Sequence, residues 1–247
     1  MAHAGPRAGG RRGHDARMFI GHFALAFAAK RAAPRTSLGV LVAATALLDL
    51  LWPVAVLAGL EVVRVAPGDT PYTPLEFVSY PWTHSALLAA IWAVLFGAAV
   101  WVATRDRAGA WVAGLLVASH WVLDLASHRP DLPLWPGGPK VGLGLWYSVP
   151  ATIAVEVAMF AGGVWLYAMA TRPRDRIGRI GFAAFVALFA LLEAMAARGE
   201  APPSAAAVAA VGLASAVVFV PWAWWFDRHR EVVGAAARRA APAASPP

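Results

Sequence analysis

The chain contains no cysteine and few charged residues. The absence of cysteine from all 247 residues excludes disulfide bonds and thiolate metal sites. Charged residues make up 14% of the chain, against about 25% in soluble domains. Hydrophobic residues make up 60%, and mean hydropathy is +0.59. This balance predicts a membrane protein whose main partner is the lipid bilayer.

The basic residues do not form one patch, although the net charge is +7. They lie in short clusters between apolar segments, which is typical of loops that set membrane topology. We therefore expect no nucleic-acid partner. The clusters at 30–35, 105–107, 172–179 and 228–239 are each two apolar segments apart. This spacing predicts six spans, with all four clusters and the C-terminus in the cytoplasm.

Six apolar segments are long enough, or nearly long enough, to cross a bilayer. They cover about 37–60, 84–104, 109–127, 148–171, 179–197 and 204–226. We therefore predict an all-α fold, a multi-pass transmembrane bundle of about six spanning helices plus a short N-terminal helix. This domain covers residues 18–227, between a disordered basic tail at 1–17 and a basic, Pro/Ala-rich tail at 228–247.

The shorter apolar run at 18–29 has two interpretations. Its basic start and Ala26-Phe27-Ala28 imitate a signal peptide. Cleavage would leave Lys30 and Arg31 outside, against the charge pattern of the later loops. The pattern favours a short helix of ~18 Å that rises to mid-membrane from the cytoplasmic end.

Residues 80–85 and 119–128 place ionisable groups at the ends of apolar runs, where such groups are costly and usually functional. His120 and Asp124 are four residues apart and share one helix face. His84 lies at a helix start, beside Thr83, and His128 closes the third span. Without cysteine, a metal here needs imidazole and carboxylate ligands, which suit zinc, manganese or iron.

Three more ionisable residues lie within apolar segments. Asp49 has three apolar neighbours on each side, and an unpaired aspartate at that depth costs ~2.5–3.5 kcal/mol. Pro53 predicts a kink after it. His22 lies in the short first helix. Glu156 lies two turns into the fourth span, as a further ligand, a general base or an interhelical hydrogen-bonding group. The topology places Asp49, His84, His120, Asp124 and His128 in the outer half of the membrane.

The order His22, Asp49, Thr83-His84-Ser85 and His120-x-x-x-Asp124 resembles the bacterial family of membrane-bound metal-dependent hydrolases, which includes LexA-regulated inner-membrane proteins. The resemblance covers about 18–165. More distantly, the order is similar to zinc-dependent phospholipase C and P1 nuclease. The sequence departs from the family pattern in two places. Asp49 is followed by Leu50 and Leu51, where the family usually has Asp-x-Asp. Pro81 precedes Trp82 and Thr83, where an Arg-Gly sequence is common in the family. The missing carboxylate argues against a second metal ion.

The resemblance implies a hydrolase with a divalent metal, zinc above all, on Asp49, His84, His120 and Asp124. His22 is then an auxiliary ligand, His128 a further candidate ligand and Glu156 a candidate catalytic residue. By analogy, the substrate is an ester or phosphoester, such as that of a phospholipid, near the outer leaflet. The alternative is a transporter that relays protons or metal through the Asp/His cluster. A third interpretation is a scaffold in which these polar residues only join helices.

Overall fold

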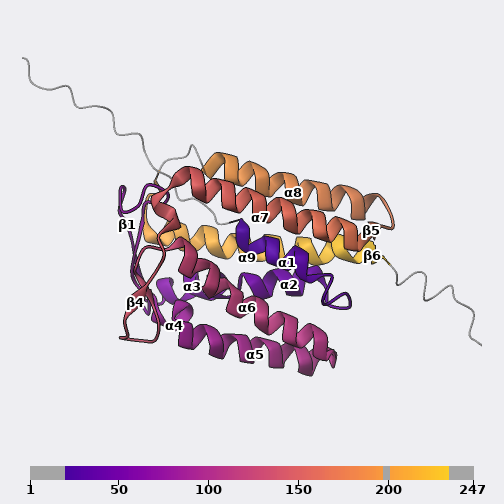
Figure 1. Ribbon diagram of the computed structural model, residues 1–247, viewed down its shortest axis with the longest axis horizontal. Coiled ribbons are helices and arrows are strands. Elements are labelled where there is room, and N and C mark those ends of the chain that lie inside the picture. Colours follow the sequence, from indigo (N-terminus) through magenta and orange to yellow (C-terminus); the bar gives the residue numbers. More distant parts are fainter. Residues whose placement is uncertain (1–19, 197–200, 234–247) are drawn as a thin grey trace, which may run out of the picture.

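The computed structural model describes residues 20–196 and 201–233, and within these ranges it is a helix bundle (Figure 1). The predicted all-α fold is confirmed, because the described strands form only three two-stranded sheets at the two ends of the bundle. The predicted tail at 1–17 and residues 234–247 lie outside the described residues.

Five described helices are long and apolar enough to cross a membrane. They are α5 (Ala86–Thr104), α6 (Arg107–Ser127), α7 (Val149–Ala170), α8 (Arg176–Ala196) and α9 (Ala205–Arg228). A sixth span exists if α2 (Leu38–Thr45) and α3 (Leu47–Leu57) are counted together. Their apolar side chains point outward as well as inward, since Val94 is 72% exposed and Val217 74% exposed. Such an apolar surface is typical of a protein that faces lipid.

The short first helix is α1 (Gly21–Ala29), and it packs inside the bundle against α2, α6 and α7. The approach to α7 is close because a Cβ atom at Gly163 would collide with the Ala24 backbone. Lys30 follows α1 and bonds Asp227 at the end of α9. The predicted short helix thus begins in the middle of the bundle and ends near the C-terminal end of α9 (Figure 1).

The sixth candidate span is broken at Ala46, where α2 and α3 meet at 54°. The predicted kink was placed at Pro53, but Pro53 lies inside α3 and packs against Gly212 of α9. At the break, the Thr45 hydroxyl donates to the Leu41 and Val42 carbonyl oxygens. The break frees the Thr45 carbonyl from its helical partner and begins α3 just before Asp49.

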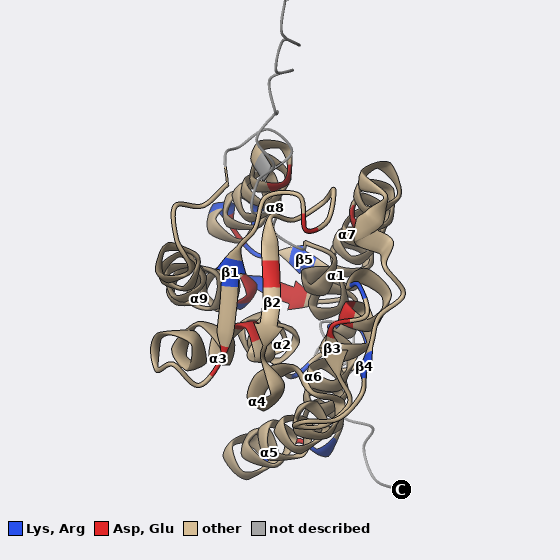
Figure 2. Ribbon diagram, turned by 90° about the vertical axis from the view of Figure 1, so that its left-hand side faces the viewer, with Lys and Arg blue, Asp and Glu red and all other residues tan. Residues whose placement is uncertain are grey.

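One end of the bundle, here called the hairpin end, carries two hairpins and two short helices (Figure 2). Its elements are β1 (Val62–Val65), β2 (Leu75–Ser79), α4 (Pro81–His84), β3 (Leu132–Pro133), β4 (Lys140–Val141) and η1 (Leu145–Tyr147). β1 pairs with β2 and β3 with β4, both antiparallel. Val63, Leu75 and Leu132 pack with Trp52 of α3 and Tyr80 in an apolar cluster beneath the hairpins.

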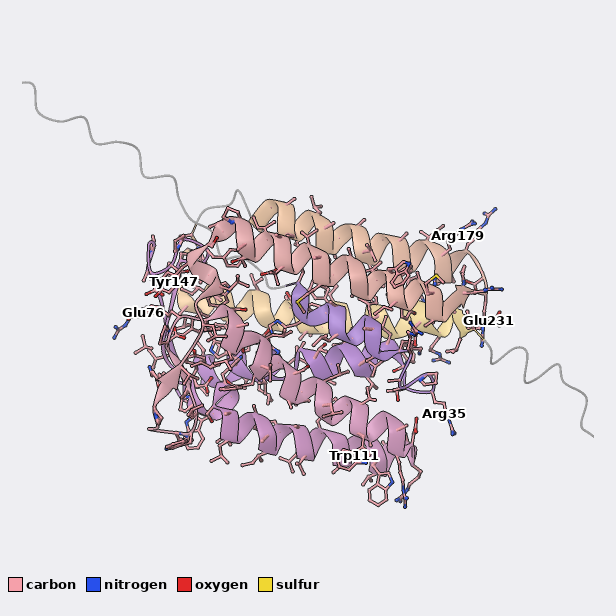
Figure 3. The ribbon with its side chains drawn as sticks, in the orientation of Figure 1. Arg35, Glu76, Trp111, Tyr147, Arg179 and Glu231 are labelled. Atoms are coloured by element: carbon pink, nitrogen blue, oxygen red, sulfur yellow. The ribbon has the colours of Figure 1, made fainter. Side chains whose placement is uncertain are left out.

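The opposite end, here called the basic end, carries Arg35 and Arg179, whereas Glu76 and Tyr147 lie at the hairpin end (Figure 3). Here β5 (Thr171–Pro173) pairs antiparallel with β6 (Arg230–Val232). Residues 228–233 of the predicted C-terminal tail therefore form the end of α9 and a strand. The side chain of Arg230 is buried and donates to the Thr171 hydroxyl and to the Gly178 carbonyl.

Candidate metal centre

Five of the residues predicted as metal ligands converge near the hairpin end. They come from four helices: His22 from α1, Asp49 from α3, His84 from α4, and His120 and Asp124 from α6. Two groups of three have ligand atoms that all lie within 4.8 Å of one another. The groups are His22, Asp49 and His120, and His84, His120 and Asp124, so His120 belongs to both.

His120 and Asp124 form the centre of the cluster. They share one face of α6, and His120 Nε2 lies 3.3 Å from Asp124 Oδ2. His22 Nε2 lies 3.4 Å from Asp124 Oδ1 and 3.4 Å from the His120 carbonyl oxygen. The His22 and His120 rings stack with their centroids 3.9 Å apart. His22 therefore contacts both of the other residues, and its Nε2 donates to the carbonyl oxygen, which can only accept. Its role as an auxiliary ligand stays a prediction.

Asp49 and His84 complete the cluster from the other side. Asp49 Oδ1 lies 3.5 Å from His84 Nε2 and 3.7 Å from His120 Nε2. His84 Nε2 is also 3.7 Å from Asp124 Oδ2. Asp49 lies in the first turn of α3, because the break at Ala46 starts a new helix there. A helix N-terminus favours a carboxylate, so the break both positions and stabilises Asp49.

A chain of hydrogen bonds orients the His84 ring. The Thr83 hydroxyl lies 2.7 Å from His84 Nδ1 and donates to Glu61 Oε2, also at 2.7 Å. A hydroxyl has one hydrogen, so Thr83 must accept from His84 Nδ1–H. Nε2 of His84 then carries the lone pair and faces both carboxylates. Glu61 also accepts from the backbone N–H groups of Trp82 and Thr83, which fixes its position.

The His120 ring is oriented in the same way. Its Nδ1 lies 2.7 Å from the Thr45 carbonyl oxygen, which accepts only, so Nδ1 carries a hydrogen and, in the neutral ring, Nε2 carries the lone pair. Metal-ligating histidines commonly donate their other ring N–H to a carbonyl or carboxylate in this manner. Both His84 and His120 thus present a lone pair toward the same two aspartates.

These contacts fit a divalent metal ion. His120 Nε2 and Asp124 Oδ2 are buried and have no hydrogen-bond partner among residues 20–196 and 201–233, although they lie 3.3 Å apart. Two acceptor atoms face each other unfavourably unless a cation or a proton lies between them. Zinc–nitrogen and zinc–oxygen bonds of about 2.0–2.2 Å in a tetrahedron place ligand atoms roughly 3.3–3.6 Å apart. The observed separations of 3.3–3.7 Å match this spacing.

His128, also predicted as a ligand, has other partners. Its Nδ1 lies 3.0 Å from Asp131 Oδ1 and 3.2 Å from the Tyr80 hydroxyl, and its ring packs against Trp146. Neither metal-compatible group of described residues includes His128. Burial raises the pKa of Asp131, but hydrogen bonds from His128, Tyr80 and Arg129 outweigh it and hold that pKa below its usual value. His128 therefore lies beside the cluster, held by a carboxylate of its own.

Glu156, predicted as a catalytic residue, is buried in α7. Its carboxylate accepts from the Ile20 backbone N–H at 3.0 Å and from the Tyr72 hydroxyl at 2.9 Å. It joins the start of α1 and the β1–β2 loop to α7. Neither metal-compatible group of described residues contains it, and its role as a general base stays a prediction.

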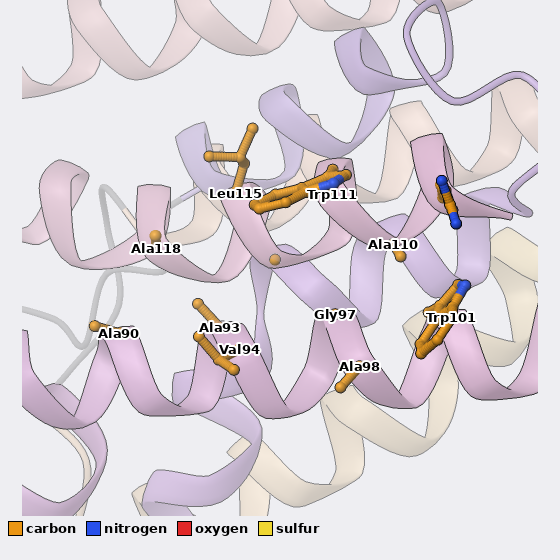
Figure 4. Close-up of a pocket in the computed structure, with 12 residues that line it drawn as sticks. Ala90, Ala93, Val94, Gly97, Ala98, Trp101, Ala110, Trp111, Leu115 and Ala118 are labelled. Carbon is orange, nitrogen blue, oxygen red and sulfur yellow. The ribbon is translucent and has the colours of Figure 1, made fainter.

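The cluster lines a cavity of about 250 Å³. His22, Asp49, His84, Asp124 and His128 form its polar side, and the rest is largely apolar, with residues from α1, α2, α3, β2, η1 and α9. A larger cavity of about 580 Å³ lies between α5 and α6 (Figure 4). Apart from Arg107, alanines, glycines, valine, leucine and tryptophans line that cavity. It shares no lining residue with the His/Asp cluster and offers none of its chemistry.

Sequence reasoning missed Thr45, Glu61, Tyr80 and Asp131 as supporting residues. Thr45 acts through its backbone carbonyl, which side-chain chemistry does not reveal. Glu61 lies in a loop 22 residues before Thr83, and no spacing rule links the two. The position of Asp131 three residues after His128 was the one available signal.

No protein-family model, curated protein or solved structure matches this chain. The resemblance to membrane-bound metal-dependent hydrolases therefore rests on the motifs and on the residues quoted for it.

Proposed function

We propose that the chain is a membrane-embedded hydrolase that uses a divalent metal ion, zinc above all, to cleave an ester or phosphoester. The observation that carries the proposal is the His/Asp cluster, of whose five members all but Asp49 are buried, with Nε2 of His84 and of His120 directed at Asp49 and Asp124. Buried ionisable groups in an apolar bundle are costly, and metal coordination offsets that cost.

Zinc bound there would supply a Lewis acid and a water whose pKa is lowered toward ~7. The carboxylates of Asp49 and Asp124 would neutralise the charge of the ion. The imidazoles of His84 and His120, already oriented by their hydrogen bonds, would bind it without a change of rotamer. Asp49, with 55% of its side chain exposed in the cavity, lies where a substrate can reach the cluster.

The membrane placement is part of the proposal. Its support is the position of the arginine-rich segments at the basic end, opposite the His/Asp cluster (Figure 3). By the positive-inside rule this end faces the cytoplasm. The cluster then lies in the outer half of an inner membrane, and the C-terminus is cytoplasmic.

Hydrolysis of aryl esters and of aryl phosphodiesters by detergent-purified, zinc-loaded protein tests the proposal. We expect turnover of one of these substrates, its loss after treatment with a chelator, and its return when zinc is added back. His120→Ala removes the residue shared by both metal-compatible groups and should abolish turnover. His229→Ala is the matched control, because His229 pairs with Asp175 near the surface.

Zinc binding without turnover of any of these compounds would contradict hydrolysis. Zinc flux into protein-containing liposomes under the same conditions would then favour the transporter.

A further inference from the structure

The cavity at the His/Asp cluster is polar on one side and apolar on the other. The longest part of the apolar wall is a stripe along α9 that runs from Val208 through Gly212 and Ala216 to Val220. This stripe covers 12 residue steps, about 18 Å along the helix. Its one hydroxyl, on Ser215, donates to the Val211 carbonyl at 2.8 Å. The wall therefore presents an apolar surface much longer than the polar cluster it faces.

Apolar residues also cover the cavity toward the hairpin end. Leu75 and Phe77 of β2 and Trp146 of η1 line it on that side. Leu75 belongs to the apolar cluster beneath the hairpins, and Phe77 packs against it. A polar, water-soluble molecule arriving from the hairpin end would have to pass this layer, so the hairpins do not form a polar path to the cluster.

The cavity reaches the surface along the seam between α3 and α9. Among its described lining residues, Asp49 and Val211 alone are exposed, with 55% of the Asp49 side chain and 61% of Val211 accessible. The two helices touch at this seam through Pro53 and Gly212. In a bundle whose outer surface is apolar, an opening at such a seam faces lipid.

From these three features we infer that the substrate is a lipid. Its apolar chain lies along the α9 stripe, and its ester or phosphoester group reaches the His/Asp cluster through the α3–α9 seam. This inference rests on the proposed function, because the bound lipid is identified with the substrate. The cavity volume of about 250 Å³ is below the ~300–1,000 Å³ of pockets that enclose a whole ligand. Only the polar group and the adjoining part of one chain therefore fit within the cavity, and the rest of the lipid stays in the bilayer.

Two matched substitutions on α9 test the inference. Ala216→Phe adds a ring to the cavity wall, whereas Ala214→Phe adds the same ring two residues away, at an exposed position outside the cavity lining. Ala216→Leu is a smaller version for the case in which phenylalanine disturbs folding. Zinc content reports on folding of the cluster in each variant, since none of these residues belongs to it.

Turnover is compared between a long-chain lipid phosphoester or ester and a short-chain analogue with the same scissile group. We expect kcat/KM in the unmodified protein to favour the long chain. Ala216→Phe should lower the long-chain kcat/KM by ~10-fold or more and the short-chain kcat/KM by clearly less, while zinc content stays unchanged. Ala214→Phe should change neither. Equal turnover of long and short chains in the unmodified protein would overturn the inference, and so would equal effects of the two phenylalanines.

Binding of a non-hydrolysable long-chain alkyl phosphonate separates this inference from the proposed function. Binding that exceeds that of methyl phosphonate, and that Ala216→Phe weakens, supports the lipid site even if nothing is hydrolysed. In that case only the hydrolase proposal fails. Binding that does not depend on chain length contradicts the lipid site, even in a protein with full hydrolytic activity toward short substrates.

Discussion

Two groups of buried polar residues lie at opposite ends of the bundle, and they differ in how completely their hydrogen bonds are made. At the basic end, Asp227 Oδ2 accepts from Lys30 Nζ at 2.7 Å and from the Leu38 backbone N–H at 2.9 Å. Its Oδ1 accepts from the Tyr167 hydroxyl at 2.6 Å. Both carboxylate oxygens have donors, so this group joins α1, α2, α7 and α9 without any ligand.

At the hairpin end, His84 and His120 direct their donors away from the centre of the His/Asp cluster and their acceptors into it. His84 and His120 donate through Nδ1 to Thr83 and Thr45, outside the cluster. Their Nε2 atoms and the carboxylates of Asp49 and Asp124 face one another at 3.3–3.7 Å. Burial alone therefore does not distinguish a metal-compatible site from a structural group in this bundle. The convergence of acceptor atoms does.

Asp124→Ala should produce the largest functional loss, because it removes the carboxylate that contacts three histidines. We expect bound zinc and hydrolytic turnover to fall to background. The free energy of unfolding of the zinc-free protein should stay the same or rise, since a buried carboxylate with an unsatisfied oxygen is gone. Metal analysis, turnover and chemical unfolding in detergent measure these effects. Zinc retained by Asp124→Ala would contradict the role of the His/Asp cluster as a metal site.

Asp227→Ala should have the opposite effect: a loss of stability with no loss of zinc binding. It leaves Lys30 buried without its carboxylate partner, and breaking a buried ion pair in this way costs about 3–5 kcal/mol of stability. The protein that still folds should bind zinc in the same ratio as the unmodified chain. Asp175→Ala, which removes a carboxylate near the surface at the same end, should cost clearly less stability, because it removes only the cap of α8, in which this carboxylate accepts from the Gly178 backbone N–H. A stable Asp227→Ala variant would show that this group does not hold the helices together.

Thr83→Val tests how His84 is oriented. It removes the hydroxyl that links Glu61 to His84 by hydrogen bonds and keeps nearly the same side-chain volume. Removing such a supporting hydrogen bond commonly weakens metal binding by about 10–100-fold, and we expect a loss in this range. Zinc affinity is measured by competition with a coloured chelator. Thr83→Ser keeps the hydroxyl and should retain the affinity. If both variants bind zinc alike, the Thr83 hydroxyl does not orient His84.

The smallest expected effect concerns pH and Asp131, outside the spanning helices. Its folded-state pKa lies below the usual value of about 3.9, because hydrogen bonds from His128, Tyr80 and Arg129 outweigh the raising effect of burial. A lowered folded pKa contributes stability above pH ~4–5 that is lost as the pH falls through the folded pKa. Thermal unfolding from pH ~7 to ~3 should show this loss, and Asp131→Asn should flatten the profile. An unchanged profile in Asp131→Asn would assign the acid sensitivity to other groups.

The fold and the members of the cluster were largely predictable from the sequence. The six apolar segments carry strong hydropathy signals, and His22, Asp49, His84, His120 and Asp124 are conspicuous because lipid-facing helices tolerate few such residues. Their meeting in one place followed from the depth of each residue in its span. His22 needed the short helix to begin in mid-bundle, as α1 does.

Other features depend on contacts between distant segments. The break at Ala46 has no glycine or proline beside it, whereas Pro53, which suggested a kink, lies within α3. Lys30 and Asp227 are 197 residues apart, and hydropathy treats both as loop charges. The side chain of His128 lies just beyond the end of α6, where helical spacing no longer sets its direction, and it contacts Asp131 instead of the cluster.

The most direct test of the central claim is the metal content of the full chain purified in detergent without added metal, measured by mass spectrometry. His84→Ala and Asp124→Ala are prepared beside His229→Ala and Asp175→Ala, a histidine and an aspartate that pair with each other far from the cluster. If the His/Asp cluster is a metal site, we expect a stoichiometric divalent ion, chiefly zinc, in the unmodified protein and in the two controls. Both cluster variants should lack it. Metal-free protein in every sample, including after equilibration with zinc, would contradict the metal site.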